Sequence, residues 1–213
     1  MIVDKLEFNL FGENTYILYD TKTREAAVVD PGMMNSRECA AFDGFIERNK
    51  LIIKYLLNTH LHIDHVTGDI YVSEHYEVPL RASLEDEFLA ERVKEQALMF
   101  RLDVNAENVR IGEPLEDGDT LTLGNERIDV IAVPGHSPGS LAFYAPSSGF
   151  VVTGDALFNM SIGRTDLPGG DYATLIRSIK EKLLSLPDET VVYPGHGEPT
   201  TIGRERQMNP FLR

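Results

Sequence analysis

The stretch NTHLHIDHVTG, residues 58–68, tells more about this protein than any other part of its sequence. It follows an apolar run, residues 51–57, that has the composition of a buried strand. Three of the 6 histidines lie between positions 60 and 65, together with Asp64. A polar helix cap would not need this clustering, whereas histidine and aspartate gathered at the end of a strand are typical of a metal site. The motif therefore predicts that the protein binds metal.

The spacing within the motif indicates two ions. On an extended chain, residues i and i+2 project to the same side, so His60 and His62 can converge on one ion. Asp64 and His65 are adjacent and diverge from that pair. They would serve a second ion close to the first, as in the two-metal sites of hydrolytic enzymes.

The composition is that of a soluble globular chain. It has 213 residues, 42% of them hydrophobic and 25% charged, which is enough for the core of one large domain spanning residues 1–213. No run approaches the roughly 18 apolar residues of a membrane span, and the first residues do not resemble a targeting signal, so we expect a cytoplasmic protein with no membrane partner. The formal net charge of −14 disfavours nucleic acid as a partner. Nothing in the sequence indicates the oligomeric state.

Two further potential ligands are interpreted as structural residues. Cys39 is the single cysteine, so an internal disulfide is excluded, and its helical surroundings indicate an inert side chain. His75 lies in an expected helix away from the other histidines. A lone helical histidine is more often a surface or core residue than a ligand.

Apolar patterns predict two blocks of strands, each followed by helices. The expected strands of the first block are residues 2–8, 14–19, 25–30, 51–58 and 78–81, and those of the second are 120–123, 127–133, 140–144, 150–153 and 190–193. The expected helices are residues 36–49, 69–76, 84–102 and 172–186. Asn35 and Glu38 resemble a capping box at the start of the first helix. Two packed sheets with helices outside them would accommodate this order.

Three later strand ends carry candidate ligands on short glycine-rich loops. His136 lies in PGHSPG, Asp155 in TGD and His196 in YPGHG. Each loop alone is consistent with ordinary turn chemistry. Together with the first motif they place five of the 6 histidines at strand ends, which is how a rigid scaffold directs several side chains to one point.

With these motifs in this order, the chain resembles the metallo-β-lactamase superfamily over nearly its whole length. The resemblance implies an α/β (α+β) fold, the four-layer αβ/βα sandwich in which two mixed β-sheets are flanked by helices and the metals lie at one edge. The residues that it implies as ligands are His60, His62 and His136 for the first metal, Asp64, His65 and His196 for the second, and Asp155 as the bridge between them. Asp30 matches the supporting aspartate of the family, which steadies the ligand loop through hydrogen bonds; a plain turn-forming aspartate is the alternative.

Within the superfamily the chain is most similar to the glyoxalase II-like (hydroxyacylglutathione hydrolase) group, in the short form that carries FNMSIGRTD after Asp155. This implies hydrolysis of a thioester such as S-lactoylglutathione by a metal-bridging hydroxide, with no serine or cysteine nucleophile. Asp64 is expected to help orient the hydroxide. True β-lactamases commonly have cysteine in the place of Asp155. Because the chain ends soon after His196, we expect the C-terminal glutathione-binding helical domain of full-length glyoxalase II to be absent.

Several alternatives are compatible with the same ligands. Zinc is the metal expected first, but sites of histidine and aspartate also accept iron or manganese. An Fe(II) persulfide dioxygenase resembles the chain in the same GRTD stretch and would use only His60, His136 and Asp155. Another ester or lactone hydrolase of the superfamily, or a non-catalytic metal-binding module, would also fit the motifs.

Arg164 is the one cation within residues 155–170. In an acidic protein, it is the candidate to bind the carboxylate of a small anionic thioester substrate. Full-length glyoxalase II has a lysine here and a tyrosine two residues later, where this chain has Asp166. An ion pair between Arg164 and Asp166 that only orders the loop is the alternative, and both interpretations stand.

Overall fold

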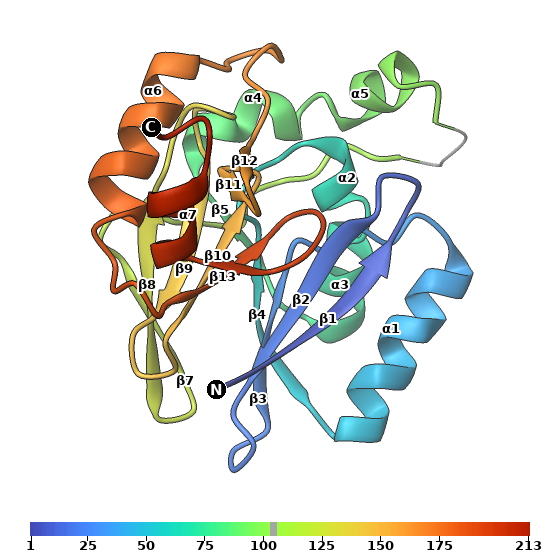
Figure 1. The fold of residues 1–213 in the computed structure, drawn as a ribbon. Helices are drawn as coiled ribbons and strands as arrows, with labels where there is room; N and C mark the ends of the chain where they lie inside the picture. Colours follow the sequence, from blue (N-terminus) through green and yellow to red (C-terminus); the bar gives the residue numbers. More distant parts are fainter. Residues whose placement is uncertain (103–105) are drawn as a thin grey trace.

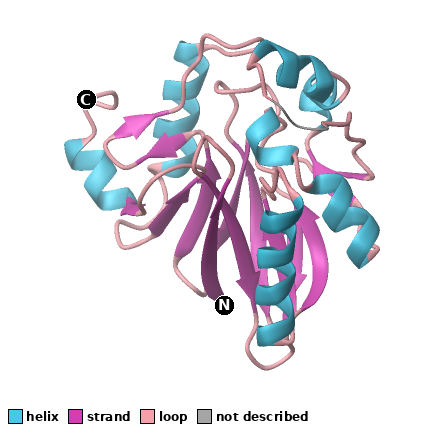
Figure 2. Ribbon diagram, turned by 90° about the vertical axis from the view of Figure 1, so that its right-hand side faces the viewer, coloured by secondary structure: helices cyan, strands magenta, loops and turns pink. Residues whose placement is uncertain are grey.

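The computed structural model describes residues 1–102 and 106–213. Its two main sheets face each other, and helices cover their outer faces, as Figure 1 and Figure 2 show. The first sheet has the strand order β1-β2-β3-β4-β5-β6, with the bounds Ile2–Phe8, Glu13–Tyr19, Glu25–Val29, Ile52–Leu57, Leu80–Ala82 and Glu113–Pro114. Strands β1 to β3 pair antiparallel, and β3 to β6 pair parallel.

The second sheet has the strand order β14-β13-β10-β9-β8-β7. The bounds of β7 to β10 are Thr120–Leu123, Glu126–Ala132, Leu141–Ala145 and Phe150–Gly154, and those of β13 and β14 are Val191–Pro194 and Thr200–Thr201. Strands β10 and β13 pair parallel, and the other neighbours pair antiparallel. A separate small hairpin joins β11 (Leu157–Phe158) and β12 (Ser161–Ile162). Both main sheets are therefore mixed, as predicted.

The helices have the bounds Ser36–Asn49 (α1), Ile63–Val66 (α2), Asp69–Tyr76 (α3), Glu87–Ala90 (α4), Val93–Met99 (α5), Tyr172–Ser178 (α6) and Ile202–Met208 (α7). A 3₁₀ turn, Leu84–Asp86, precedes α4, and a π-helical turn, Ile179–Leu183, continues α6. Helix α1 begins as predicted, because the Asn35 side chain accepts hydrogen bonds from the N–H groups of Arg37 and Glu38.

Side-chain alternation along the strands divides the hydrophobic core into three layers. In β2, Tyr16 and Leu18 point between the two sheets, whereas Ile17 faces the layer shared with α1 and α3. In β10, Val152 points between the sheets and Val151 faces the layer shared with α6 and α7. Both faces of each sheet are therefore buried, and the four-layer arrangement expected from the sequence is confirmed.

The long helix predicted over residues 84–102 is wrong. It is broken into the 3₁₀ turn, α4 and α5, because tertiary contacts take over its backbone hydrogen bonds. The carbonyl of Ala90 accepts from the N–H of Val109 at 3.1 Å, and the N–H of Lys94 donates to the Asn108 side chain at 3.1 Å. In an unbroken helix these two groups would bond to each other. The apolar period continued across the break, so the sequence did not reveal it.

All the strands predicted from the sequence are present, with bounds shifted by at most two residues. The strands that the prediction missed, β6, β11, β12 and β14, have 2 residues each and carry no readable apolar period. Helices α2, with 4 residues, and α7, with 7 residues, were missed as well. Within residues 1–102 and 106–213, no helix is both long and apolar enough to cross a membrane.

Candidate metal centre

The ligand motif forms the turn between β4 and α2. His60 and His62 lie on the extended segment, and Asp64 and His65 lie in the first turn of α2, at the edge where Figure 1 also shows the β1–β2 hairpin. The side-chain amide of Asn58 donates to the carbonyl of His65 at 2.8 Å, which closes the turn. The change from strand to helix, which was not predicted, directs the two pairs of potential ligands to different clusters.

The first cluster consists of His60, His62 and His136. The Nε2 atoms of His60 and His136 are 3.2 Å apart, and Nδ1 of His62 lies 2.9 Å from Nε2 of His136. All three residues are buried. Three imidazole nitrogens that converge in this way form one face of a metal site.

In His136 and His60, the contact made by Nδ1 determines that Nε2 directs its lone pair toward the centre of the cluster. Nδ1 of His136 lies 2.7 Å from the carbonyl oxygen of Arg164 and must donate to it. Nδ1 of His60 lies 3.1 Å from the Thr59 hydroxyl, whose own hydrogen is donated to Asp30 at 2.6 Å. In the neutral rings the two Nε2 atoms are therefore unprotonated.

Two lone pairs at this distance repel each other unless a cation lies between them. A proton is disfavoured there, because burial and the neighbouring histidines lower the pKa of His60 well below its usual range and lower that of His62 to about 3. A divalent ion, which needs neutral imidazole ligands, matches this environment. The donor set of the first cluster therefore fits a metal.

The second cluster consists of Asp64, His65 and His196. Oδ2 of Asp64 lies 3.2 Å from Nε2 of His196 and 3.8 Å from Nε2 of His65. Nδ1 of His65 is held by Asp30 at 3.1 Å, and Nδ1 of His196 lies 3.2 Å from the carbonyl oxygen of Phe11. The inward Nε2 of His65 is buried and has no hydrogen-bond partner among the described residues. A metal would satisfy it.

Asp155 lies between the two clusters. Its Oδ1 is 3.5 Å from Nε2 of His65, and its Oδ2 is 3.6 Å from Nε2 of His196 and 3.7 Å from Nε2 of His136. A Cβ at Gly195 would lie 2.2 Å from Oδ1 of Asp155, so only glycine leaves room for this carboxylate. The carboxylate of Asp155 therefore faces both clusters.

The second cluster favours positive charge, unlike the first. Burial alone would lower the pKa of His65, but the carboxylates of Asp64, Asp155 and Asp30 outweigh it and raise the pKa well above its usual range. Burial likewise opposes the ionisation of Asp64, yet His65 and His196 hold its pKa well below the usual value. The carboxylate of Asp64 is therefore ionised, as a metal ligand must be.

A third group of potential donors, Asp30, His60 and His65, is occupied by other contacts. The two oxygens of Asp30 accept hydrogen bonds from the N–H and hydroxyl of Thr59 at 2.7 and 2.6 Å, besides the contact with His65. Asp30 thus holds the ligand loop from behind, in the place expected of the supporting aspartate. Two metal positions fit the described residues, and this group is not a third.

Comparison with known proteins now identifies the family. A model of the metallo-β-lactamase superfamily matches residues 9–196. The chain belongs to this superfamily. It is 38% identical to the hydroxyacylglutathione hydrolase GloC of Haemophilus influenzae, over 100% of this chain and 98% of that protein.

Two solved structures are similar to this chain in fold. The crystal structure of TTHA1623 in a di-iron-bound form covers 100% of both chains at 36% identity, with a TM-score of 0.86. The crystal structure of BLEG-1, a B3 metallo-β-lactamase, covers 99% of both chains at 33% identity, also with a TM-score of 0.86. This protein is therefore a metallohydrolase of the metallo-β-lactamase superfamily, and its His and Asp clusters fit a dinuclear divalent site.

Asp86 supports two of the ligand loops, and no motif in the sequence indicated this role. Its buried carboxylate accepts from the N–H of Leu61 at 3.2 Å, from the Ser137 hydroxyl at 2.7 Å and from the N–H of Gly139 at 2.7 Å. It therefore joins the loop of His60 to the loop of His136. In the sequence, Asp86 stands in an acidic stretch that reads as the solvent-exposed start of a helix.

Two amides also brace the ligand loop. Oε1 of Gln96 accepts from the N–H of Ile63 at 3.0 Å, and its Nε2 donates to the carbonyl of Leu89 at 3.1 Å. Nδ2 of Asn9 donates to the carbonyl of Asp64 at 2.9 Å. Neither residue belongs to a recognisable motif, so only their positions in space reveal what they hold.

The metal donors open into a cavity of about 220 Å³. Its lining consists of His62, Asp64, His136, Asp155 and His196, with Phe11, Ile63, Phe100, Leu167 and Arg164. The Arg164 guanidinium forms two hydrogen bonds with Asp166, at 2.6 and 2.7 Å. The ion pair considered from the sequence is thus present, and whether Arg164 also contacts the substrate stays a prediction.

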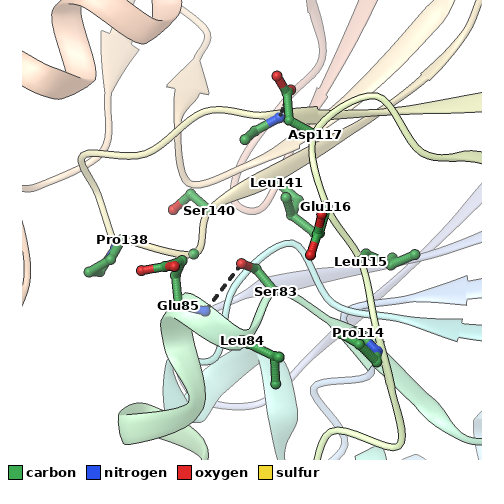
Figure 3. A pocket seen from close by; sticks show the side chains of 12 residues that line it. Ser83, Leu84, Glu85, Pro114, Leu115, Glu116, Asp117, Pro138, Ser140 and Leu141 are labelled. Carbon is green, nitrogen blue, oxygen red and sulfur yellow. Dashed lines mark hydrogen bonds between the residues drawn. The ribbon is translucent and has the colours of Figure 1, made fainter.

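A second hollow of about 280 Å³ lies away from these donors (Figure 3). Its wall includes three acidic side chains, Glu85, Glu116 and Asp117, and no member of the two clusters. The acidic wall would repel an anionic substrate, whereas the cavity at the clusters holds the potential metal ligands.

The two residues interpreted as structural lie outside the clusters. His75 stacks on Tyr71 in α3, with ring centroids 5.3 Å apart, and it belongs to none of the donor groups found among the described residues. Cys39 is half-buried in α1. Its burial raises the pKa of the thiol, and the negative charges of Asp43 and Glu38 raise it further. The thiol is therefore a poor nucleophile.

Proposed function

We propose that this protein is a dinuclear metal-dependent hydrolase of small thioesters, with S-lactoylglutathione as the first substrate to test. The observation that carries the proposal is Asp155, whose two oxygens face donors of both clusters. The likeness to a protein named hydroxyacylglutathione hydrolase supports the choice of substrate. Two histidine-rich positions joined by one carboxylate suit the hydrolysis of an activated carbonyl.

In this proposal, the first position is formed by His60, His62 and His136, and the second by Asp64, His65 and His196, with Asp155 as the bridge. Two divalent ions, zinc first and iron or manganese otherwise, would supply a hydroxide at neutral pH and an electrophile for the thioester carbonyl.

The remaining work falls to residues of the chain itself. Asp30 holds Nδ1 of His65, and the carbonyl of Phe11 holds Nδ1 of His196, so both rings keep one nitrogen directed at the centre. The ionised Asp64 would accept a hydrogen bond from the attacking hydroxide and orient it.

The test combines metal analysis with a thiol-release assay on S-lactoylglutathione. The metal-replete protein should bind two ions per chain and release glutathione. His196→Ala should lose mainly the second ion and most of the activity, and the matched control His75→Ala should keep both. Full turnover by a protein that never exceeds one ion per chain would rule out the dinuclear mechanism.

One observation favours a second candidate, an Fe(II) persulfide dioxygenase. His60, His136 and Asp155 form a two-histidine, one-carboxylate set, with 3.2 Å between the two Nε2 atoms and 3.7 Å from Nε2 of His136 to Oδ2 of Asp155. Oxygen uptake with glutathione persulfide separates the two functions. A dioxygenase would consume oxygen with one iron per chain and would keep this activity in His196→Ala.

A further inference from the structure

One side of the metal-site cavity is apolar. Phe11, Ile63, Phe100 and Leu167 line it, and they come from four separate segments: the β1–β2 loop, the start of α2, the residue after α5, and the loop before α6. None of them is a potential metal ligand. Their convergence beside the donors therefore needs another explanation.

Phe11 and Phe100 form a pair at the cavity. Their ring centroids are 5.9 Å apart and their planes are nearly perpendicular, at 81°. Phe11 nevertheless keeps 39% of its surface exposed. An aromatic ring that is left partly in water beside a catalytic centre still has apolar surface to bury, and a substrate could bury it.

The position of Phe11 is fixed rather than loose. Its N–H donates to Oδ1 of Asn9 at 2.9 Å, and its carbonyl accepts from His196 at 3.2 Å. The same loop therefore orients a metal donor and presents the ring. Because the backbone is held from both sides, little ordering is required when a ligand packs against the ring.

The charged side chains at the cavity also favour an apolar ligand group over an anionic one. Arg164 is the one lysine or arginine in its described lining, and it already forms two hydrogen bonds with Asp166. Asp64 and Asp155 add negative charge. Away from the reacting centre, the described wall offers more apolar contact than binding groups for anions.

We propose that Phe11, Ile63, Phe100 and Leu167 form an apolar subsite, so that the preferred substrates are thioesters carrying an aliphatic or aromatic group larger than lactoyl. This inference rests on the proposed thioester hydrolysis and adds the chemical class of the substrate. The group can belong to the acyl side or to the thiol side, and the experiment separates the two.

The test uses two series of uncharged thioesters with the metal-replete enzyme. One series lengthens the acyl chain from acetyl to hexanoyl on a constant small thiol, and the other lengthens the thiol on a constant acetyl group. In the series that reaches the subsite, kcat/KM should rise about fourfold per buried methylene, equivalent to about 0.8 kcal/mol. The series with the rise identifies the side of the substrate that binds there.

Variants locate the effect. Phe11→Ala should flatten the rise while leaving metal content unchanged, because the contact with His196 comes from the main chain. Phe11→Leu should keep part of it. The matched control is Phe211→Ala, which removes a ring of similar exposure, 43%, outside the cavity and should leave the rise intact.

Non-hydrolysable thioether analogues of both series give a readout that is independent of turnover. Their dissociation constants, measured by calorimetry, should fall with chain length in the wild type and much less in Phe11→Ala. Hydrolysis without any dependence on chain length in either series, or equal losses in Phe11→Ala and Phe211→Ala, would overturn the apolar subsite while leaving thioester hydrolysis standing. If no thioester is cleaved, the proposed function fails, and the analogues alone decide the subsite.

Discussion

The two donor clusters differ in burial and in charge. The first consists of three histidines, and the side chain of His136 is only 3% exposed. The second contains a carboxylate, and the side chain of His196 is 25% exposed. Burial lowers the pKa values of His60 and His62 and keeps both rings neutral, whereas the carboxylates around His65 raise its pKa. From this difference we expect the inner position (His60, His62 and His136) to hold its ion more permanently, and the outer position (Asp64, His65 and His196) to exchange its ion with the solvent.

Asp155 joins the two positions, so its loss should have the largest effect. We expect Asp155→Ala to lower the occupancy of both ions together and to reduce kcat/KM for a thioester about 1,000-fold or more, because several kcal/mol of charge stabilisation disappear with the ions. Elemental analysis and thiol release measure both. The matched control Asp117→Ala, in the hollow of Figure 3, should keep both ions. Activity of Asp155→Ala within a factor of two of wild type would contradict its assignment as the bridge.

Removing one histidine from each position tests the difference directly. His196→Ala should lose the outer ion and retain the inner one, with activity reduced about 100-fold, because one site can still polarise the carbonyl. His60→Ala should leave the protein unable to retain the inner ion during dialysis. If the two variants lose the same ions at the same rate, the clusters are equivalent and the proposed difference is wrong.

Two buried carboxylates contact the two positions unequally, because Asp86 joins the loops of His60 and His136, whereas Asp30 contacts His65 directly and His60 only through Thr59. Asp86→Asn should weaken metal retention at the inner position about 10- to 100-fold, because it disturbs the contacts with Leu61, Ser137 and Gly139. Asp30→Asn should mainly weaken the outer position through His65. Metal titration of each variant is the measurement. A loss at the opposite position in either variant would show that support is shared between the two positions.

The smallest effect is expected at Arg164, which lies at the rim. If it binds the substrate carboxylate, Arg164→Ala should lower kcat/KM about tenfold for a glutathione thioester and much less for a neutral one. Equal losses on both substrates, with metal content intact, would show that the residue only orders the loop.

The pairing of Arg164 with Asp166 should hold at every practical assay pH. The hydrogen bond from Arg164 lowers the pKa of Asp166 from 3.8 to about 2. Because the pKa of Asp166 is lower in the folded protein than in the unfolded chain, the pair stabilises the fold above about pH 4. This stabilisation is lost as the pH falls through 2. In a pH profile of the free energy of unfolding, Arg164→Ala should therefore be less stable than wild type above about pH 4 and should converge with it as the pH falls through 2, and a difference that appears only below pH 4 would contradict this sign.

Local sequence determined the strands and most of the candidate ligands of this protein. Apolar alternation is set by the two-residue repeat of a strand, so the strand bounds could be predicted closely. The ligands were visible because several lie within one short motif and the others follow strand ends on glycine loops. The N-cap at Asn35 was also predictable from local sequence, because its hydrogen bonds reach no further than three residues along the chain.

Tertiary structure alone decided how these pieces meet. The contacts of Asp155 with both clusters, the bracing by Asp86, and the pairing of Phe11 with Phe100 all join segments far apart in the chain. The break in the predicted helix also depends on a distant partner, Asn108. A side chain's own sequence neighbours do not reveal which distant backbone group it will satisfy, because that partner is selected only when the layers pack.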